Sequence, residues 1–200
     1  MRRKVFDVLA SAGGLVLVAV LVVAGSLLLW GNSFTNNSVH NQLAQQKIYF
    51  PPASAFAHAK AGTEITPGMK PYLLQYAGQQ LTTGPQAEAY ADHFIAVHLS
   101  EMPYHGVYSL VSSAARANPK NAQLAALETT SFQGTTLRGL LLEAYGFWKM
   151  GQIALWAAIS SFILAGVMLV LVGLGFWHSR RVPVDKDLLR EKDEQMRLSA

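Results

Sequence analysis

The chain has 200 residues, of which 51% are hydrophobic and only 14% are charged. Soluble domains carry about 25% charged residues, and here the missing charge is concentrated in two uncharged runs near the ends of the chain. This composition excludes an ordinary soluble globule and a disordered chain. The absence of cysteine excludes disulfides, thiolate zinc sites and a cysteine nucleophile. A net charge of +4 is too small and too scattered to indicate nucleic-acid binding.

The two uncharged runs cover residues 9–30 and 153–177. At about 1.5 Å per residue, a helix over either run would cross a bilayer core of ~30 Å, and a helix satisfies its own backbone groups inside lipid. The first run is longer than the core of a cleaved signal peptide, and no A-x-A-like site follows Trp30, so we expect an uncleaved signal anchor. Trp30 and Trp177 close the two runs, as expected at a membrane interface.

Basic residues set the expected orientation. They stand at positions 2–4 before the first run and at positions 180–181 after the second, which predicts that both termini are cytoplasmic in a multi-pass protein of the cytoplasmic (plasma) membrane. The predicted organisation is a cytoplasmic N-terminus (1–8), a transmembrane helix (9–30), an extracytoplasmic helical domain (31–152), a second transmembrane helix (153–177) and a cytoplasmic tail (178–200).

The predicted outer domain is all-α. Apolar residues recur at helical spacing from Pro85 to Met102, with Thr83 as the N-cap, Gln86 as its capping-box partner and Pro103 as the stop. Further helices are predicted over 66–77, 107–117 and 122–132, and another from 135 through the second apolar run to 177. Residues 47–50 are a weak strand candidate. The expected fold is an all-α membrane protein, with two transmembrane helices flanking a small helical bundle.

The histidines offer one candidate site for a divalent metal. His98 and Glu101 are three residues apart on a predicted helix, and His105 follows soon after Pro103, so the candidate ligands are His93, His98, Glu101 and His105. The alternative is that these residues are polar groups at helix ends. No other cofactor is predicted, and no catalytic residue is assigned, because the chain has no G-x-S-x-G, P-loop or dinucleotide fingerprint.

The second apolar run contains a ladder of small residues. Ala157, Ser161 and Ala165 repeat every four residues, which lets helix backbones approach closely inside a membrane. These three residues are predicted to pack against the first transmembrane helix or against a second copy of the chain.

Several segments resemble an actinobacterial family of two-span membrane proteins. They are the runs IYFP (48–51), TGPQA (83–87), YADHFIAVHL (90–99), TLRGLLL (136–142) and FWH (176–178). The resemblance covers nearly the whole chain and implies a membrane location with a helical outer domain. Members of the family often carry the label of an aromatic ring-opening dioxygenase. That label implies Fe(II) held by two histidines and a carboxylate, which here would be His93, His98 and Glu101.

The function that the sequence favours is an integral membrane protein with an outer helical interaction domain, a structural or accessory component of a membrane complex. Its expected partners are membrane lipid and either another protein or a second copy of the chain. The alternative is an extracytoplasmic protein that binds a small ligand or a metal. A ring-cleaving enzyme, which only the family label implies, comes third.

Overall fold

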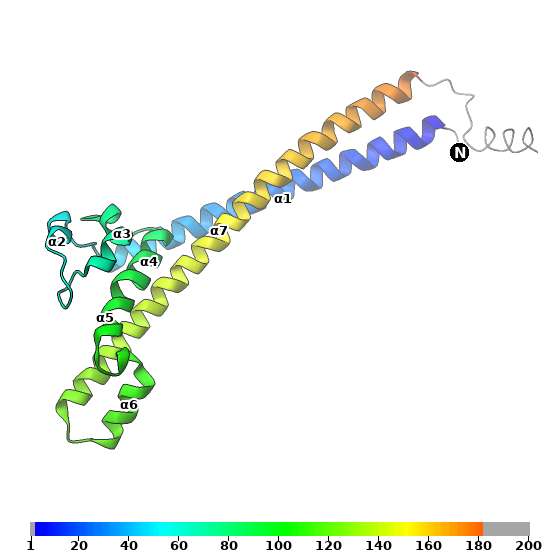
Figure 1. The fold of residues 1–200 in the computed structure, drawn as a ribbon. Coiled ribbons are helices and arrows are strands. Elements are labelled where there is room, and N and C mark those ends of the chain that lie inside the picture. Colours follow the sequence, from blue (N-terminus) through cyan, green and yellow to red (C-terminus); the bar gives the residue numbers. More distant parts are fainter. Residues whose placement is uncertain (1–2, 182–200) are drawn as a thin grey trace, which may run out of the picture. The chain divides into compact units, whose positions relative to one another are not determined.

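A computed structural model describes residues 3–181, and these residues form helices and no β-strand (Figure 1). Two helices are long: α1 covers Arg3–Gln46 and α7 covers Ala122–Arg181. Both are long and apolar enough to cross a membrane. The described chain divides into two units: the paired-helix unit, residues 3–32 with 153–181, and the helical unit, Ser33–Gln152. Most of the predicted tail, from residue 182 onward, lies outside the described residues.

In the paired-helix unit, α1 and α7 pack antiparallel through one narrow seam. Gly14 lies against Val172, and the Ser161 hydroxyl donates a hydrogen bond to the Leu21 carbonyl over 2.8 Å. The inward residues alternate in steps of three and four, a repeat of seven that keeps one stripe of a helix facing its neighbour. They are Asp7, Ser11, Gly14, Val18, Leu21, Gly25, Leu28 and Asn32 from α1, and Ala154, Ala158, Ser161, Ala165, Met168, Val172, Gly175 and Ser179 from α7.

Between the two long helices, the helical unit contains a series of short helices. The longest series, α4–η3–α5, contains a π-helical segment, η3, and begins at a capping box between Thr83 and Gln86. The series ends before Pro103, where Met102 is extended, as the residue before a proline prefers to be. The elements are α2 (Ala53–Ala57), η1 (Pro67–Met69), α3 (Lys70–Leu73), η2 (Leu74–Tyr76), α4 (Gly84–Tyr90), η3 (Ala91–Ile95), α5 (Ala96–Glu101), η4 (Pro103–Gly106) and α6 (Tyr108–Ala117).

The core of the helical unit is built from side chains far apart in the sequence. Val39 and Leu43 of α1 and Leu141 of α7 are buried in it together with the short segments. The backbone of α4 at Gly84 lies directly against the Trp148 side chain of α7, because a Cβ atom at Gly84 would overlap the Trp148 ring. Apolar burial is the main stabilising term of such a core. Its other buried members are Phe50, Phe56, Ile65, Met69, Leu73, Leu81, Ala87, Ala89, Ala91 and Ile95.

Most predicted helices are present, with changes at their ends. The helix over 85–102 and its capping box are confirmed, as is the helix over 107–117. The predicted helix over 66–77 is instead three short pieces, η1, α3 and η2, because Pro71 has no N–H to donate and its ring disfavours a continuous helix through residue 67. The predicted helices over 122–132 and 135–177 are one helix, α7. Residues 47–50 contribute only an isolated bridge between Tyr49 and Gln80.

Candidate functional site

The four predicted metal ligands lie in η3, α5 and η4, and each has different neighbours. The His93 ring stacks on Tyr72 with centroids 3.5 Å apart. The Nδ1 atom of His98 lies 2.7 Å from the Phe94 carbonyl oxygen, within the same helical series. Because a carbonyl oxygen only accepts, this short contact assigns the proton to Nδ1 and leaves Nε2 as an acceptor.

His105 and Glu101 complete the predicted set. The Nδ1 atom of His105 lies 3.3 Å from the Ser100 carbonyl oxygen, and Glu101 is exposed at the end of α5. Over residues 3–181, the structure places no three histidine, aspartate or glutamate side chains in one group able to hold a metal ion. The four residues are therefore not gathered into one cluster, and the metal site stays a prediction.

The π-helical segment η3 borders a small polar cavity. Asp92, in this segment, accepts a hydrogen bond from an Arg138 guanidinium nitrogen of α7 over 2.7 Å. The cavity has a volume of about 190 Å³, and its walls include Tyr72, Glu88 and His93. π-Helical turns occur often at functional sites. Asp92 and Arg138 are both partly exposed, so their ion pair contributes little to stability.

A left-handed turn follows α5. Tyr104, His105 and Gly106 have φ angles of 58°, 54° and 62° in succession. The left-handed conformation costs roughly 1–2 kcal/mol for a residue with a side chain, so the turn needs support from its surroundings. The fully buried hydroxyl of Ser131 provides one such contact, since it donates to the Gly106 carbonyl oxygen over 2.6 Å.

Exposed apolar side chains surround this turn and the start of α6. Leu110 is 53% exposed and Phe132 is 54% exposed, although both are large and apolar. Tyr108 packs against Phe132 with ring centroids 5.5 Å apart, which joins α6 to α7 at the surface. We call this surface the aromatic patch; it consists of Tyr104, Val107, Tyr108, Leu110 and Phe132.

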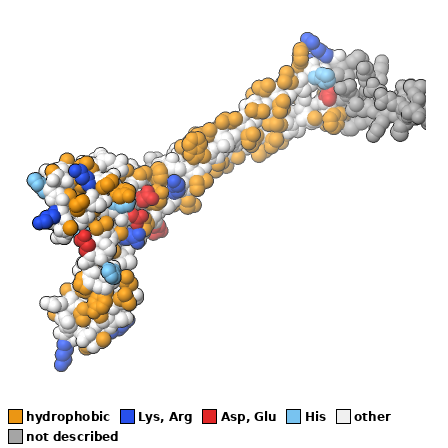
Figure 2. Space-filling view, in the orientation of Figure 1, with side chains coloured by type: hydrophobic (Ala, Val, Ile, Leu, Met, Phe, Trp, Pro, Cys, Tyr) orange, Lys and Arg blue, Asp and Glu red, His pale blue; other side chains and the backbone are white. Residues whose placement is uncertain are grey.

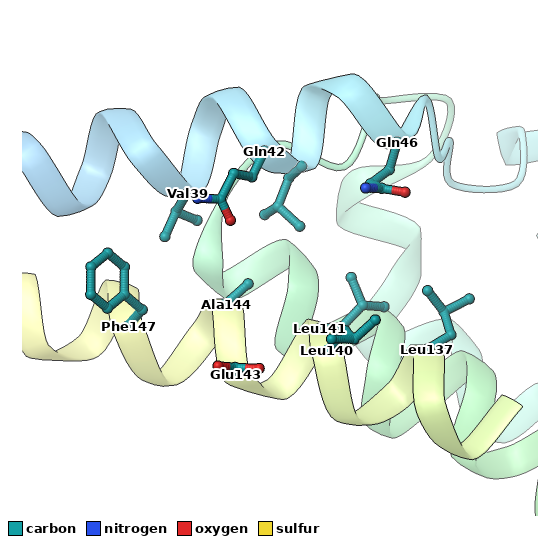
Figure 3. A pocket seen from close by; sticks show the side chains of 10 residues that line it. Val39, Gln42, Gln46, Leu137, Leu140, Leu141, Glu143, Ala144 and Phe147 are labelled. Atoms are coloured by element: carbon teal, nitrogen blue, oxygen red, sulfur yellow. The ribbon is translucent and has the colours of Figure 1, made fainter. Parts of the chain in front are cut away.

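An apolar groove lies elsewhere on the helical unit, where residues 39–46 of α1 run beside residues 137–147 of α7 (Figure 3). Its volume is about 420 Å³. Gln42 and Gln46 reach from α1 toward α7, and Phe147 points from α7 toward α1 (Figure 3). The remaining lining residues are Val39, Leu43, Leu137, Leu140, Leu141, Glu143 and Ala144.

The small residues predicted for helix packing are divided between two faces of α7. Ser161 and Ala165 lie in the seam of the paired-helix unit, whereas Ala157 is exposed and Ala158 takes the inward position. The reason is geometric: a strict step of four drifts around a helix, and the seam alternates steps of three and four. Glycines outside the predicted ladder also lie in the seam: Gly25 faces Phe162, and Gly175 faces Ser11.

The comparisons with known proteins add no family to this description. No family model, no curated protein and no solved structure matches the chain.

Proposed function

We propose that this chain is an integral membrane protein, with both termini in the cytoplasm and the helical unit outside, and that the aromatic patch docks a partner protein in a membrane complex. The proposal of a membrane location rests on the distribution of side chains in the paired-helix unit. Most inward positions there hold glycine, alanine or a polar residue, with a few larger residues such as Leu21 and Val172 between them, and large apolar residues cover the outward faces. This arrangement is the reverse of a soluble helical pair, in which the large apolar side chains form the contact.

The exposed faces of both helices support contact with lipid. Val16 of α1 is 66% exposed and Trp156 of α7 is 68% exposed, and many large apolar neighbours share this exposure. Hydrophobic side chains cover much of the surface of both helices (Figure 2). A surface of this kind is expected to aggregate in water. In lipid it is the expected surface, and close packing of small residues then holds the helices together.

The basic flanks support the orientation. Arg180 and Arg181 lie at the end of α7, and the Arg181 guanidinium carbon lies 4.1 Å from the centroid of the Trp177 ring. A tryptophan and an arginine in this arrangement suit the headgroup level, where the ring is partly buried and the charge is solvated. Positive charge at this end of the spans favours the cytoplasmic side.

The aromatic patch supports the docking role. Protein interfaces are enriched in tyrosine and phenylalanine, and a few such residues supply most of the binding energy. Tyr108 and Phe132 are held in contact by two different helices, so they are presented with little freedom to lose on binding. The left-handed turn fixes the backbone of Tyr104 at the edge of the same patch.

Cysteine labelling tests the membrane arrangement without background, since the chain has no natural thiol. In intact cells, an impermeant maleimide should label cysteines placed at the exposed residues Ser54 and Ser113. It should not label a cysteine at Ser199, which lies outside the described residues, until the membrane is permeabilised. Labelling at position 199 in intact cells would refute the proposed orientation.

A second experiment tests docking separately. A photo-crosslinking amino acid at Leu110 should give one discrete adduct with a partner in membranes, and Phe132→Ala should remove that adduct. Tyr49→Ala is the matched control, because Tyr49 is an aromatic residue with similar exposure outside the patch. Loss of the adduct in both variants, or in neither, would contradict docking at the patch even if the labelling result holds.

A further inference from the structure

We propose that the groove between residues 39–46 of α1 and residues 137–147 of α7 binds a single-chain amphiphile with an uncharged or cationic head. The alkyl chain would lie along the groove, and the head would meet the amide and carboxylate groups on its walls. This site is separate from the aromatic patch and does not depend on the docking role.

The shape and lining of the groove suit an alkyl chain. Binding pockets for small molecules have volumes of roughly 300–1,000 Å³, and this groove has about 420 Å³. The stretch of α7 along it is roughly 15 Å long at 1.5 Å per residue, so the space is elongated rather than round. Its floor includes the buried side chains of Val39, Leu43 and Leu141.

Large apolar side chains on the wall of the groove are exposed. Leu140 is 58% exposed, and Leu137 and Phe147 are each 37% exposed, although all three line the groove. Covering these side chains with an alkyl chain removes apolar surface from water, which is the main driving force for binding in such a pocket.

The polar groups on the walls set the head group. The Gln42, Gln46 and Glu143 side chains make no hydrogen bond within the described part of the chain, so the Glu143 carboxylate can accept hydrogen bonds and the two amides can both accept and donate them. Glu143 is the only ionisable lining residue, and no lysine or arginine is found among the described residues that line the groove. A carboxylate or phosphate head would therefore meet like charge at Glu143, whereas a hydroxyl or an amine would donate to the Glu143 carboxylate.

Photolabelling of the full chain in lipid nanodiscs tests the proposal. The probes are a monoacylglycerol and a fatty acid that carry the same diazirine-bearing chain, used at a pH where the fatty acid is ionised. The monoacylglycerol should label peptides that contain residues 39–46 and 137–147 more strongly than the fatty acid does. Leu140→Asp should reduce this labelling about tenfold, because it places a charge in the apolar wall.

Two further variants separate the site from general lipid contact. Leu74→Asp is the matched control, since Leu74 is an exposed leucine outside the groove, and it should label like the wild type. Glu143→Lys should shift the preference about tenfold toward the fatty acid, because it replaces the repelling charge with an attracting one. Labelling confined to residues 9–30 and 153–177, equal labelling of Leu140→Asp and wild type, or an unchanged preference in Glu143→Lys would each overturn the proposal.

Discussion

The seam of the paired-helix unit predicts that Gly14 and its neighbour Gly13 respond oppositely to the same substitution. A Cβ atom at Gly14 would lie 2.6 Å from Cγ2 of Val172, which is far too close, whereas a Cβ atom at Gly13 would meet nothing within 4 Å. Val172 is buried and β-branched, so its side chain has little freedom to move away. Gly14→Leu should therefore force the two helices apart, and Gly13→Leu should leave them paired.

The size of the effect follows from overpacking. Extra methylene groups in a close-packed contact cost about 1–3 kcal/mol, and a change of one or two kcal/mol shifts an equilibrium roughly 5- to 30-fold. Leucine is also a better helix former than glycine by up to ~1 kcal/mol. Both variants share that gain, so the difference between them isolates the contact with Val172.

A cysteine pair at Ser11 and Gly175 measures the pairing directly. A Cβ atom built at Gly175 lies 3.6 Å from the Ser11 Cβ atom, within the range of about 3.5–4.5 Å found across disulfides. The double-cysteine chain should oxidise readily in membranes, as should the same chain with Gly13→Leu. With Gly14→Leu the disulfide yield should fall at least about 5-fold, the shift that 1 kcal/mol produces. Equal yields in the two leucine variants would refute the seam and its register.

Three other perturbations test the helical unit, each measured by thermal unfolding in detergent. Ser131→Val should cost about 1–3 kcal/mol, because it leaves the Gly106 carbonyl without its buried donor; an unchanged melting temperature would show that the left-handed turn needs no such support. Gly84→Ala should destabilise by about 1–3 kcal/mol through overlap with the Trp148 ring, while Gly139→Ala, with open space around it, should be neutral or stabilising. Burial, with a smaller contribution from the Glu64 charge, raises the pKa of Tyr90 above its ordinary value of 10.0. The folded state therefore holds this proton more tightly, and the contribution of Tyr90 to stability should be constant below about pH 10 and fall as the pH rises above it. Tyr90→Phe should lessen that fall, and an identical pH profile would argue against the burial of this phenol.

Local signals explain which helices the sequence could predict. The capping box at Thr83 and Gln86 and the stop at Pro103 act over a few residues, so they define the series from α4 to α5 without knowledge of the fold. Residues 122–132 and 135–177 are predicted as two helices, but the chain between them, which contains Gly134, is helical as well. Gly134 is inside a continuous helix, where a Cβ atom would lie 2.8 Å from the Leu99 side chain. This glycine permits close approach between helices and does not end one.

Other features depend on contacts that the sequence does not display. The first apolar run ends at Trp30, but α1 continues to Gln46 because Val39 and Leu43 enter the core of the helical unit. The left-handed turn could not be anticipated, since Tyr104 is a bulky residue that rarely adopts positive φ. The groove is likewise formed by two segments about 100 residues apart in the chain. The seam of the paired-helix unit, however, can be recognised in part from the sequence. Small residues recur there in steps of three and four within an apolar run, as in Ala154, Ala158, Ser161 and Ala165.

The composition of the core of the helical unit constrains the order of events during synthesis. Leu141 of α7 belongs to the same buried cluster as Val39 and Leu43 of α1, so the cluster is incomplete until translation has passed residue 141. At about 5–20 residues per second, the ribosome needs roughly 5–20 s to travel from one side of this cluster to the other. Throughout that interval the first apolar helix exists without its seam partner, and the second apolar run emerges almost as soon as the cluster can close. In the membrane arrangement proposed above, core formation outside and helix pairing in the bilayer would therefore be late, nearly simultaneous steps.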